Sequence, residues 1–362
     1  MADEGFSAHG IDPALGRLGF SSRFSELFAP LAEDGFVPGR IWRVDRGLPL
    51  VHTAETTVRC EPAAHLGRAG GSGAERVAVG DWVALSQPPG HEWPLIEAIL
   101  PRSSAFLRRD PGGLSEPQVV AANMDTVFVM HGLARELNVR RLERELVLAW
   151  DSGAQPVVIL GKSDLADENL DTVMKQAEAA APGAPVHVLS SLTGSGVSEL
   201  ERYLGPGCTV ALLGASGVGK STLVNLLAGE DLQATAEVRE SDHKGRHTTV
   251  SRQMIVVRSG GIIIDTPGLR GLALGDAAGG MAEAFSDIER IARECRFRDC
   301  AHADEPGCAV TRAVEDGSLD ARRLRSYRDL KGEAGPPVGS RSGLSRRAGS
   351  PAPPKRRGSR GS

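Results

Sequence analysis

The chain has 362 residues, of which 41% are hydrophobic and 24% are charged, and its formal net charge at pH 7 is -4. This length allows two or three hydrophobic cores, because single domains usually span on the order of 100 to 200 residues. The slightly acidic balance argues against a protein that is coated evenly with basic groups, although it is compatible with local basic patches for an anionic partner.

No apolar run approaches the roughly 20 residues that a membrane-spanning helix needs. The N-terminal sequence MADEGFSAHG lacks the basic and apolar segments of an export signal. We therefore expect a cytoplasmic monomer with no membrane partner. Of the five cysteines, Cys60 and Cys208 stand alone, whereas the other three lie in one short window beside a histidine. In a reducing compartment such clustering favours a metal site over disulfides.

Residues 1–37 form an N-terminal extension whose scattered apolar positions predict one short helix and no chemistry. Short β-rich runs follow over residues 38–106, and they read RIWRV, LVHTA, TTVRC, RVAVGDWVAL and PLIEAIL. Several short strands separated by turn residues predict a small all-β barrel or sandwich. The stretch between Cys60 and Arg76 has too little apolar material to pack, which favours a mobile loop within that barrel.

A different pattern begins near Val119, where apolar runs alternate with amphipathic helical segments up to about residue 278. The runs read DTVFVM, PVVILGKSD, VHVLSS, CTVALLGASG and GIIIDTPG, and the helical segments include VRRLERELVLAW and STLVNLLAG. This alternation is typical of a mostly parallel α/β sheet. The pattern of residues 281–330 then predicts a small α-rich unit, and residues 331–362 have the composition of a disordered basic tail.

The strongest chemical signal is a match to the phosphate-loop pattern G-x-x-x-x-G-K-[ST]. Its residues are Gly214, Ala215, Ser216, Gly217, Val218, Gly219, Lys220 and Ser221. The match lies between a predicted strand at 208–213 and a predicted helix at 221–228, which is the context that the motif requires. The glycines allow backbone N-H groups to point at phosphate oxygens, and Lys220 can reach the β and γ phosphates. We expect Ser221 to bind Mg²⁺ and Thr222 to complete the nucleotide-binding loop.

Two later segments complete the phosphate side of this predicted site. Asp265 ends the apolar run 261–264 and opens the sequence Asp265-Thr266-Pro267-Gly268, which resembles the D-x-x-G motif of GTPases. In that motif the aspartate serves magnesium and the glycine N-H faces the γ-phosphate. Between the two motifs lies a polar loop with Thr248 and Thr249, at the spacing where GTPases carry a threonine that closes over magnesium and the γ-phosphate. Either threonine can serve, and we assign the magnesium contact to Thr249.

The base-reading elements come earlier in the chain. A carboxylate can accept hydrogen bonds from both N1-H and the exocyclic amine of guanine, a pattern that adenine cannot match. Lys162, Ser163 and Asp164 follow the apolar run 156–160 and fit N-K-x-D, except that Gly161 replaces the asparagine. That change removes an amide, so guanine selectivity should rest on Asp164 and affinity should be weaker. A second loop, Ser190-Ser191-Leu192, resembles the S-A-K loop whose backbone contacts guanine O6.

The order of these motifs is permuted relative to ordinary GTPases, since base-reading loops at 161–164 and 190–192 precede phosphate-binding loops at 214–221, 248–249 and 265–268. Permutation preserves the geometry of the site, because ligands of such sheets bind at the carboxyl ends of the strands whichever loop is opened.

A cysteine and histidine cluster follows the α/β region. Its members are Cys295, Cys300, His302 and Cys308. Three thiolates and one imidazole form a complete tetrahedral set for one structural zinc, with no open position for water. We therefore expect Zn²⁺ to support this unit and to take no part in chemistry, against the alternative of three chance cysteines beside a histidine.

A β-barrel, a permuted set of GTPase motifs and a C-x4-C-x-H-x5-C unit together resemble the ribosome small subunit-dependent GTPase A (RsgA) family over residues 38–330. The resemblance implies an OB-fold at 38–106, a P-loop GTPase at 119–278 and a zinc-binding domain at 281–330. It also implies docking on the small (30S) ribosomal subunit during late maturation, with 16S rRNA stimulating hydrolysis of GTP to GDP and phosphate.

The residue after the D-x-x-G motif is Leu269, where many GTPases place a glutamine that orients water. A hydrophobic side chain cannot orient water, so another group must do so. The resemblance points to His247, because the family carries a histidine at this position and an imidazole can orient or deprotonate water. We therefore predict His247 and Lys220 as the catalytic residues, while a purely local hydrogen bond of His247 in its loop remains the alternative.

Arginines near the C-terminus are candidates for phosphate contacts with RNA. Those on the last predicted helix are Arg322, Arg323, Arg325 and Arg328, and the basic tail adds more. A solvated helix face is the simpler interpretation of the same pattern.

Three other functions fit parts of the sequence. A nucleotide-gated RNA-binding scaffold with negligible turnover is compatible with Gly161 and Leu269. A permuted GTPase of the large subunit or of another RNA would share the nucleotide site, but the barrel and the zinc unit argue against it. An ATPase or kinase would share the phosphate loop, but Asp164 argues against adenine.

Overall fold

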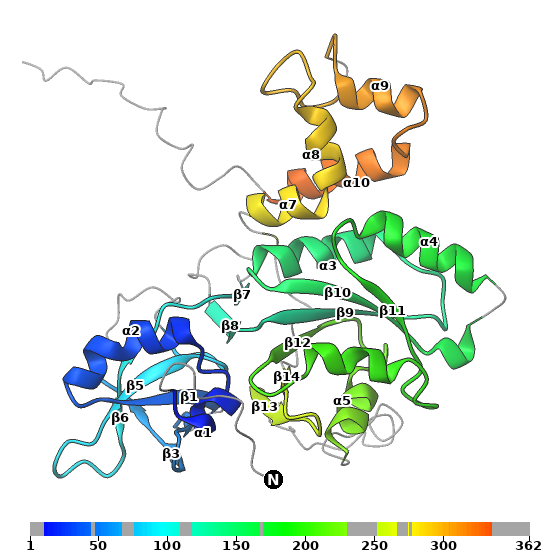
Figure 1. The fold of residues 1–362 in the computed structure, drawn as a ribbon. Helices are drawn as coiled ribbons and strands as arrows, with labels where there is room; N and C mark the ends of the chain where they lie inside the picture. The colour runs from blue at the N-terminus through cyan, green and yellow to red at the C-terminus, as the bar shows by residue number, and fades with distance from the viewer. Residues whose placement is uncertain are drawn as a thin grey trace, which may run out of the picture.

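Figure 1 shows the chain as three adjoining parts: a small β-rich part capped by α1 and α2, a central α/β part, and a helical part, α7 to α10, that lies over α3. The computed structural model describes residues 11–44, 48–66, 76–108, 118–166, 169–229, 252–265, 274, 277–303 and 305–334. Within these ranges no helix is both long and apolar enough to cross a lipid bilayer.

The N-terminal extension contains two helices where the sequence predicted one: α1 (Pro13–Arg17) and α2 (Ser22–Glu33). They are separated by a turn at Gly19, whose φ of 89° favours glycine, and a Cβ there would lie 2.7 Å from the carbonyl oxygen of Gly207. Phe20 packs edge-on against Trp82 with ring centroids 4.7 Å apart. The helices therefore cover the β-rich part with an aromatic core of their own.

Six strands make up the β-rich part: β1 (Val37–Val44), β2 (Leu50–His52), β3 (Thr57–Arg59), β4 (Glu61–Pro62), β5 (Trp82–Ser86) and β6 (Leu95–Ile99). The strands pair in the order β3-β2-β1-β5-β6-β4. The two end strands, β3 and β4, follow each other directly in the chain, so the row of strands returns to its start through the backbone. These pairings close a ring, as a barrel requires. Its interior is formed by Ile41, Val51, Cys60, Val83, Leu85 and Ile96.

Two details of the barrel differ from the sequence-based expectation. The run 76–85 is not one strand, because the chain turns at Gly80 (φ 92°) and β5 begins only at Trp82. The segment after Cys60 was predicted to be a loop, but its start forms β4, and Ala63 is buried. Residues 67–75 of that segment lie outside the described residues.

A buried arginine joins the barrel to its neighbours. The guanidinium of Arg40 donates hydrogen bonds to the carbonyl oxygens of Gly80 (3.3 Å), Asn123 (2.9 Å) and Leu18. These oxygens belong to the barrel, to the connection into the α/β part and to the N-terminal helices. Burial lowers the pKa of Arg40 to about 10, partly offset by Asp125 and Asp81. Three carbonyl groups from distant segments thus meet one cation at a single joint.

The hairpin of β7 (Ala105–Arg108) and β8 (Gln118–Ala122) leads into the α/β part. Its strands are β9 (Thr126–Gly132), β10 (Gln155–Gly161), β11 (Val186–Val188), β12 (Thr209–Gly214), β13 (Arg252–Val256) and β14 (Ile262–Asp265). Its helices are α3 (Val139–Asp151), α4 (Leu170–Ala180) and α5 (Lys220–Ala228), with short 3-10 turns η2 (Ser163–Leu165) and η3 (Val197–Tyr203). The strands β11, β10, β9, β12 and β14 pair in parallel in that order, which confirms the predicted parallel arrangement.

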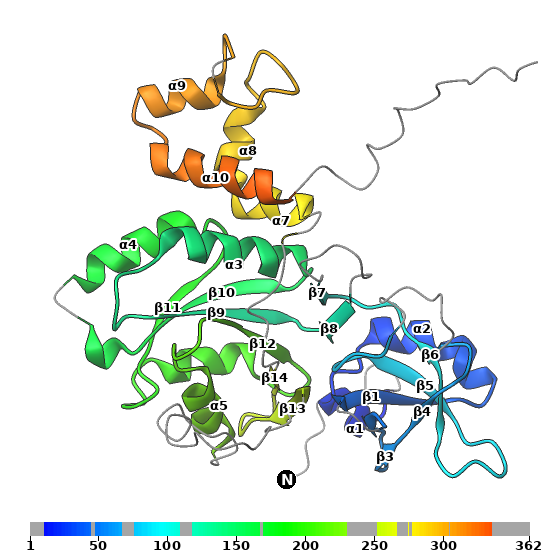
Figure 2. The same cartoon turned by 180° about the vertical axis from the view of Figure 1, so that it is seen from behind.

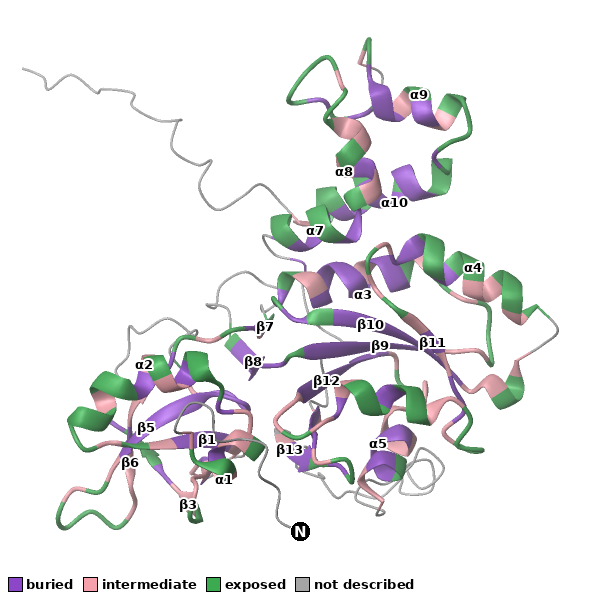
Figure 3. Ribbon diagram, in the orientation of Figure 1, coloured by how far each residue is buried: buried purple, intermediate pink, exposed green. Residues whose placement is uncertain are grey.

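Helices α3 and α4 lie on one face of this sheet and α5 lies on the other, as the view from behind also shows (Figure 2). The central strands are buried along their length (Figure 3). Along β9, Val127 and Val129 pack in the core under α3, while Phe128 and Met130 pack in the core over α5. This alternation follows from the two-residue period of a strand that is covered on both faces.

The barrel and the α/β sheet are continuous. Strand β13 pairs antiparallel with β14 on one side and with β1 of the barrel on the other, with Arg43 opposite Gln253 and Val44 opposite Arg252. The barrel is therefore attached both through the Arg40 joint and through a shared sheet.

The helical part consists of α7 (Ala278–Ala284), α8 (Ser286–Ala292), α9 (Ala309–Glu315) and α10 (Ala321–Ala334), and we call it the metal module. Residues 282–294 do not form one continuous helix, because the chain breaks at Phe285 between α7 and α8. The same hydrophobic core contains Leu142 and Leu146 of α3 together with Phe285 and Tyr327 of the module. The module thus shares its core with the α/β part.

Candidate functional site

The phosphate-loop sequence forms the turn between β12 and α5. Three of its glycines have positive φ, namely Gly214 at 145°, Gly217 at 77° and Gly219 at 105°. A Cβ at Gly214 would lie 2.4 Å from the carbonyl oxygen of Met130. Only glycine allows the loop to pass this close to β9 while turning back into the helix.

The lysine of the loop folds over its own backbone. Its Nζ donates hydrogen bonds to the carbonyl oxygens of Gly214 (2.9 Å) and Ala215 (2.6 Å). Ser221 and Thr222 follow Lys220 in the first turn of α5, and all three side chains are partly exposed. Lysine, hydroxyl groups and the start of a helix therefore gather at one place, as phosphate binding requires.

The predicted base-reading loop follows β10. Lys162 has a left-handed backbone with φ of 63°, and Ser163 and Asp164 form the short turn η2. Ser190, which is buried, donates its hydroxyl hydrogen to Oδ1 of Asp164 at 2.5 Å. The two predicted base-reading loops are thus linked to each other, and Leu192 at the tip of the second is 81% exposed.

The loops predicted to read the base and to bind the phosphates meet at the carboxyl edge of the sheet. A Cβ added at Gly161 would lie 3.5 Å from the carbonyl oxygen of Val218 in the phosphate loop. A Cβ added at Gly132, at the end of β9, would lie 3.7 Å from Cδ of Lys162 and 3.8 Å from Cα of Val218. Two motifs that are far apart in sequence therefore both pack against the end of β9, which we call the floor of the site.

Asp265 ends β14, which pairs in parallel with β12 beside the phosphate loop, and it lies opposite Gln253 in the register of β13. The carboxylate thus starts from the same edge of the sheet as the phosphate loop. The other predicted residues of the phosphate side, His247, Thr248, Thr249 and Gly268, lie outside the described residues, as does Leu269.

One buried group beneath this floor was not anticipated from the sequence. Nε2 of His131 on β9 lies 2.9 Å from Oε2 of Glu145 on α3, and Oε1 of Glu145 accepts a hydrogen bond from Arg141 at 2.9 Å. These two atoms are close, but they are not aligned as a directed hydrogen bond. A carboxylate on the buried face of the segment VRRLERELVLAW was the signal that sequence reasoning passed over.

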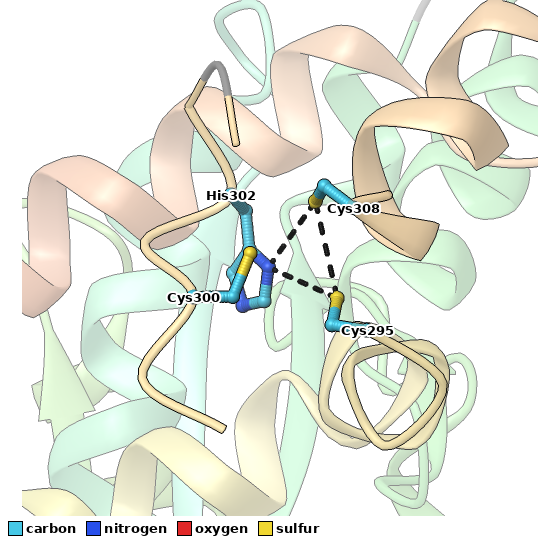
Figure 4. Close-up of side chains that lie close together, drawn as sticks. All are labelled: Cys295, Cys300, His302 and Cys308. Atoms are coloured by element: carbon cyan, nitrogen blue, oxygen red, sulfur yellow. Dashed lines mark hydrogen bonds between the residues drawn. The ribbon is translucent and has the colours of Figure 1, made fainter. Parts of the chain in front are cut away.

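The cysteine and histidine cluster of the metal module is assembled in space (Figure 4). Cys295 follows α8, Cys308 caps α9, and Cys300 and His302 come from the loop between them. Its four ligand atoms all lie within 4.8 Å of one another. Nδ1 of His302 is 3.6 Å from Sγ of both Cys295 and Cys308, and those two sulfurs are 3.9 Å apart.

These separations fit zinc. Bonds of about 2.3 Å to sulfur and about 2.0 Å to nitrogen in a tetrahedron place two sulfurs about 3.8 Å apart and sulfur about 3.5 Å from nitrogen. Backbone amides of Ala309 and Thr311 donate to the sulfurs of Cys295 and Cys308 at 3.3 Å, as thiolates favour. Burial acts against the thiolate of Cys308, but hydrogen bonds led by Thr311 lower its pKa to about 6. The donor set can therefore hold a metal ion.

The arginines of α10 do not share one role. Arg322, Arg325 and Arg328 are exposed, as phosphate contacts require. Arg323 is only 8% exposed, and it donates to Glu143 at 2.7 Å and to both carboxylate oxygens of Asp287 at 2.8 Å. The expectation that Arg323 is available for RNA is therefore wrong, because its guanidinium is fully engaged inside the protein.

A family model described as RsgA GTPase matches residues 99–275. A Streptomyces coelicolor protein named small ribosomal subunit biogenesis GTPase RsgA is 44% identical over 329 residues, which cover 90% of this chain and 88% of that protein. A protein of the same name from Streptomyces avermitilis is 45% identical and covers 90% and 85%.

Among solved structures, YjeQ from Thermotoga maritima is similar with a TM-score of 0.61 and 28% identity, over 82% of this chain and 98% of that one. YloQ, described as a circularly permuted GTPase, is similar in fold, with a TM-score of 0.59 and 22% identity over 82% and 94% of the two chains. The chain thus shares its overall fold with these two solved structures.

Proposed function

Because the chain belongs to the RsgA family of small ribosomal subunit biogenesis GTPases, we propose that it binds the 30S subunit and its 16S rRNA in the cytoplasm and assists late maturation of that subunit. Its nucleotide state controls binding and release. The contact between the loop at Gly161 and the phosphate loop at Val218 supports the proposal most directly, since it brings base-reading and phosphate-binding motifs to one site despite their permuted order.

The nucleotide is held from both sides of that contact. We assign the base to Lys162, Ser163, Asp164, Ser190, Ser191 and Leu192, and the phosphates to residues 214–222, Thr248, Thr249, Asp265 and Gly268. The carboxylate of Asp164 accepts two hydrogen bonds from guanine, and the hydroxyl of Ser190 holds that carboxylate in place. Adenine offers no matching pair of donors, so the site selects GTP over ATP.

Hydrolysis needs an in-line water and compensation of charge on the phosphates. Ser221 and Asp265 offer hard oxygen ligands beside the phosphate loop, which suit Mg²⁺, and Thr249 adds a third. Bound Mg²⁺ would neutralise charge on the β and γ phosphates. Lys220 exchanges its two backbone carbonyl partners for phosphate oxygens, and the imidazole of His247 orients the attacking water.

The chain has three domains, and the nucleotide site lies in the second of them. A ring of short strands supports an OB-fold at 38–106, and it adjoins the permuted GTPase domain at 119–278. One structural zinc in the domain at 281–330 is held by Cys295, Cys300, His302 and Cys308. Helix α10 runs on to Ala334, so the segment 331–362, predicted as a basic tail, begins within that helix.

RNA is contacted from the metal module and the tail. Arg322, Arg325 and Arg328 are exposed on α10. Phe297, which is 42% exposed and near the metal ligands, has the guanidinium carbon of Arg296 5.4 Å from its ring centroid. Exposed arginines suit phosphates, and an exposed aromatic ring suits an unpaired base. The barrel presents a second surface of a class that commonly binds nucleic acid.

GTP orders the segments around 239–249 and after Gly268 and thereby sets the grip on RNA, and hydrolysis releases it. The pairing of β13 with β1 supports this hypothesis, because β13 begins just after the first of those segments and its first residues, Arg252 and Gln253, pair with the barrel strand β1.

Two measurements test the proposal. Binding to 30S subunits should be tighter with a non-hydrolysable GTP analogue than with GDP, and equal affinities would rule out nucleotide control. Phosphate release should rise on adding 30S subunits to the wild type, fall to background in Lys220→Ala, and stay low in His247→Ala although GTP still binds. The last two variants separate loss of binding from loss of chemistry.

A second function, an RNA-binding scaffold with negligible turnover, is favoured by one observation. Gly161 has no side-chain amide that could connect the base loop to the phosphate loop at Val218, although there is space for an asparagine side chain at this position. The absence of phosphate release above background with 30S subunits present would favour this function over the enzyme.

A further inference from the structure

Helix α3 carries two buried carboxylates that face opposite ways. Glu143 is 2% exposed and Glu145 is 6% exposed. Residues two positions apart on an α-helix differ by about 200° around its axis, because each residue turns by about 100°. One carboxylate therefore faces the sheet beneath the nucleotide site, and the other faces the metal module.

On the sheet side, Glu145 contacts His131, whose successor in β9 is Gly132. The backbone at Gly132 is the floor that lies against both Lys162 and Val218. Glu145 is fixed in turn by Arg141 at 2.9 Å. A displacement of α3 along the sheet would therefore shift the end of β9, where the base-reading and phosphate loops meet.

On the module side, Glu143 accepts a hydrogen bond from Arg323 of α10 at 2.7 Å. The same guanidinium binds Asp287 of α8 and the carbonyl oxygen of Ala284, both at 2.8 Å, and lies 4.5 Å from the ring centroid of Phe285. Arg323 thereby ties α10, α7 and α8 to one point on α3. Arg323 and Glu143 are both buried, which makes this contact well defined.

The helices also touch backbone to backbone. A Cβ at Gly280 of α7 would lie 2.2 Å from the carbonyl oxygen of Val147 and 2.8 Å from Cβ of Asp151, both on α3. A Cβ added at the neighbouring Gly279 would have no atom of the described residues outside its own helix backbone within 4 Å. Gly280 therefore sets how closely the module docks on α3, while Gly279 has the same backbone freedom and no contact.

We propose that α3 couples the metal module to the nucleotide site, so that binding of a small ribosomal subunit at the module accelerates hydrolysis through the Arg323–Glu143 and Glu145–His131 contacts. The proposal rests on the function argued above and names the element that carries its regulation. Reciprocity holds for binding free energies, so any change that the subunit makes in the affinity for the nucleotide equals the change that the nucleotide makes in the affinity for the subunit. Couplings of this kind usually amount to about 5- to 150-fold.

The experiment compares Gly280→Val with its matched control Gly279→Val in the full-length protein. Metal content, basal GTP hydrolysis, binding to 30S subunits and 30S-stimulated hydrolysis are measured for each. In Gly280→Val the metal content and basal rate should equal those of the wild type, while stimulation should fall at least about fivefold, the lower end of the coupling range. Gly279→Val should be stimulated like the wild type.

If Gly280→Val binds 30S subunits and its hydrolysis is stimulated as in the wild type, the coupling through α3 is refuted, while the proposed function stands. If Gly280→Val loses its metal or aggregates, Glu143→Gln replaces it, since it keeps the volume at the anchor and removes the charge that faces Arg323. Retained stimulation in that variant would overturn the coupling and lost stimulation would support it. A wild-type protein that 30S subunits neither bind nor stimulate would refute the proposed function, and the coupling with it.

Discussion

Ser190 donates its hydroxyl hydrogen to Oδ1 of Asp164, across the two loops that we assign to the guanine base. The two residues come from the ends of neighbouring parallel strands, β11 and β10. A short side chain on one loop thus fixes the carboxylate on the other before any base is present. Preorganisation of this kind lowers the entropic cost of binding.

Ser190→Ala should weaken binding of GDP by about tenfold or more, because hydrogen bonds to charged groups contribute about 1.5 to 3 kcal/mol. Selectivity for GDP over ADP should narrow by a similar factor, since the freed carboxylate no longer points at the base. Titration with fluorescent GDP, and competition with ADP, give both quantities. Ser195→Ala, at an exposed position of the same loop, is the control and should bind like the wild type.

Gly161→Asn should tighten GDP binding by about tenfold, close to the upper range for one added hydrogen bond. The space exists, because a Cβ at this position makes ordinary contacts of 3.5 Å and 3.8 Å with the carbonyl oxygens of Val218 and His131. An asparagine amide can then donate to the phosphate loop. Gly161→Ala supplies the Cβ without the amide, and equal tightening in both variants would show that no such bond forms.

Arg323→Ala and Arg325→Ala should separate stability from RNA binding on one helix. Loss of Arg323 leaves Glu143 buried without its cation, so the free energy of unfolding should fall by about 3 to 5 kcal/mol. Arg325 is exposed, so Arg325→Ala should change stability by less than about 0.5 kcal/mol while weakening binding to 30S subunits and its salt dependence. Urea unfolding and binding at two salt concentrations measure both effects, and equal destabilisation would contradict the assignment.

Removal of the metal should unfold the loops that connect α8 and α9. Cys300→Ser should lose about one equivalent of zinc and unfold at lower temperature, because metal binding supplies folding free energy that so small a unit lacks. Metal analysis and thermal unfolding check this expectation. Cys208→Ser is the control, since Cys208 precedes β12 in the α/β part, and it should keep its zinc. Full zinc content in Cys300→Ser would remove that cysteine from the ligand set.

Local patterns in the sequence were sufficient for the parts whose geometry depends on neighbours in the chain. The alternation of apolar runs and helical segments predicts the parallel sheet, because strand and helix periods are local properties. The spacing of Cys295, Cys300, His302 and Cys308 predicts the metal cluster, because a short segment can bring its own ligands together. The phosphate loop is recognisable for the same reason, since its glycines must turn a strand into a helix within a few residues.

Only the tertiary structure decided which charges are buried and which elements adjoin. Arg322, Arg323, Arg325 and Arg328 look alike in sequence, yet Arg323 alone among them is enclosed, because Glu143 and Asp287 come from elements packed against its side of α10. Likewise, nothing in the run at Arg43 indicates that β1 pairs with β13. Burial and pairing depend on partners distant in the chain, and their positions exist only once the whole fold has formed.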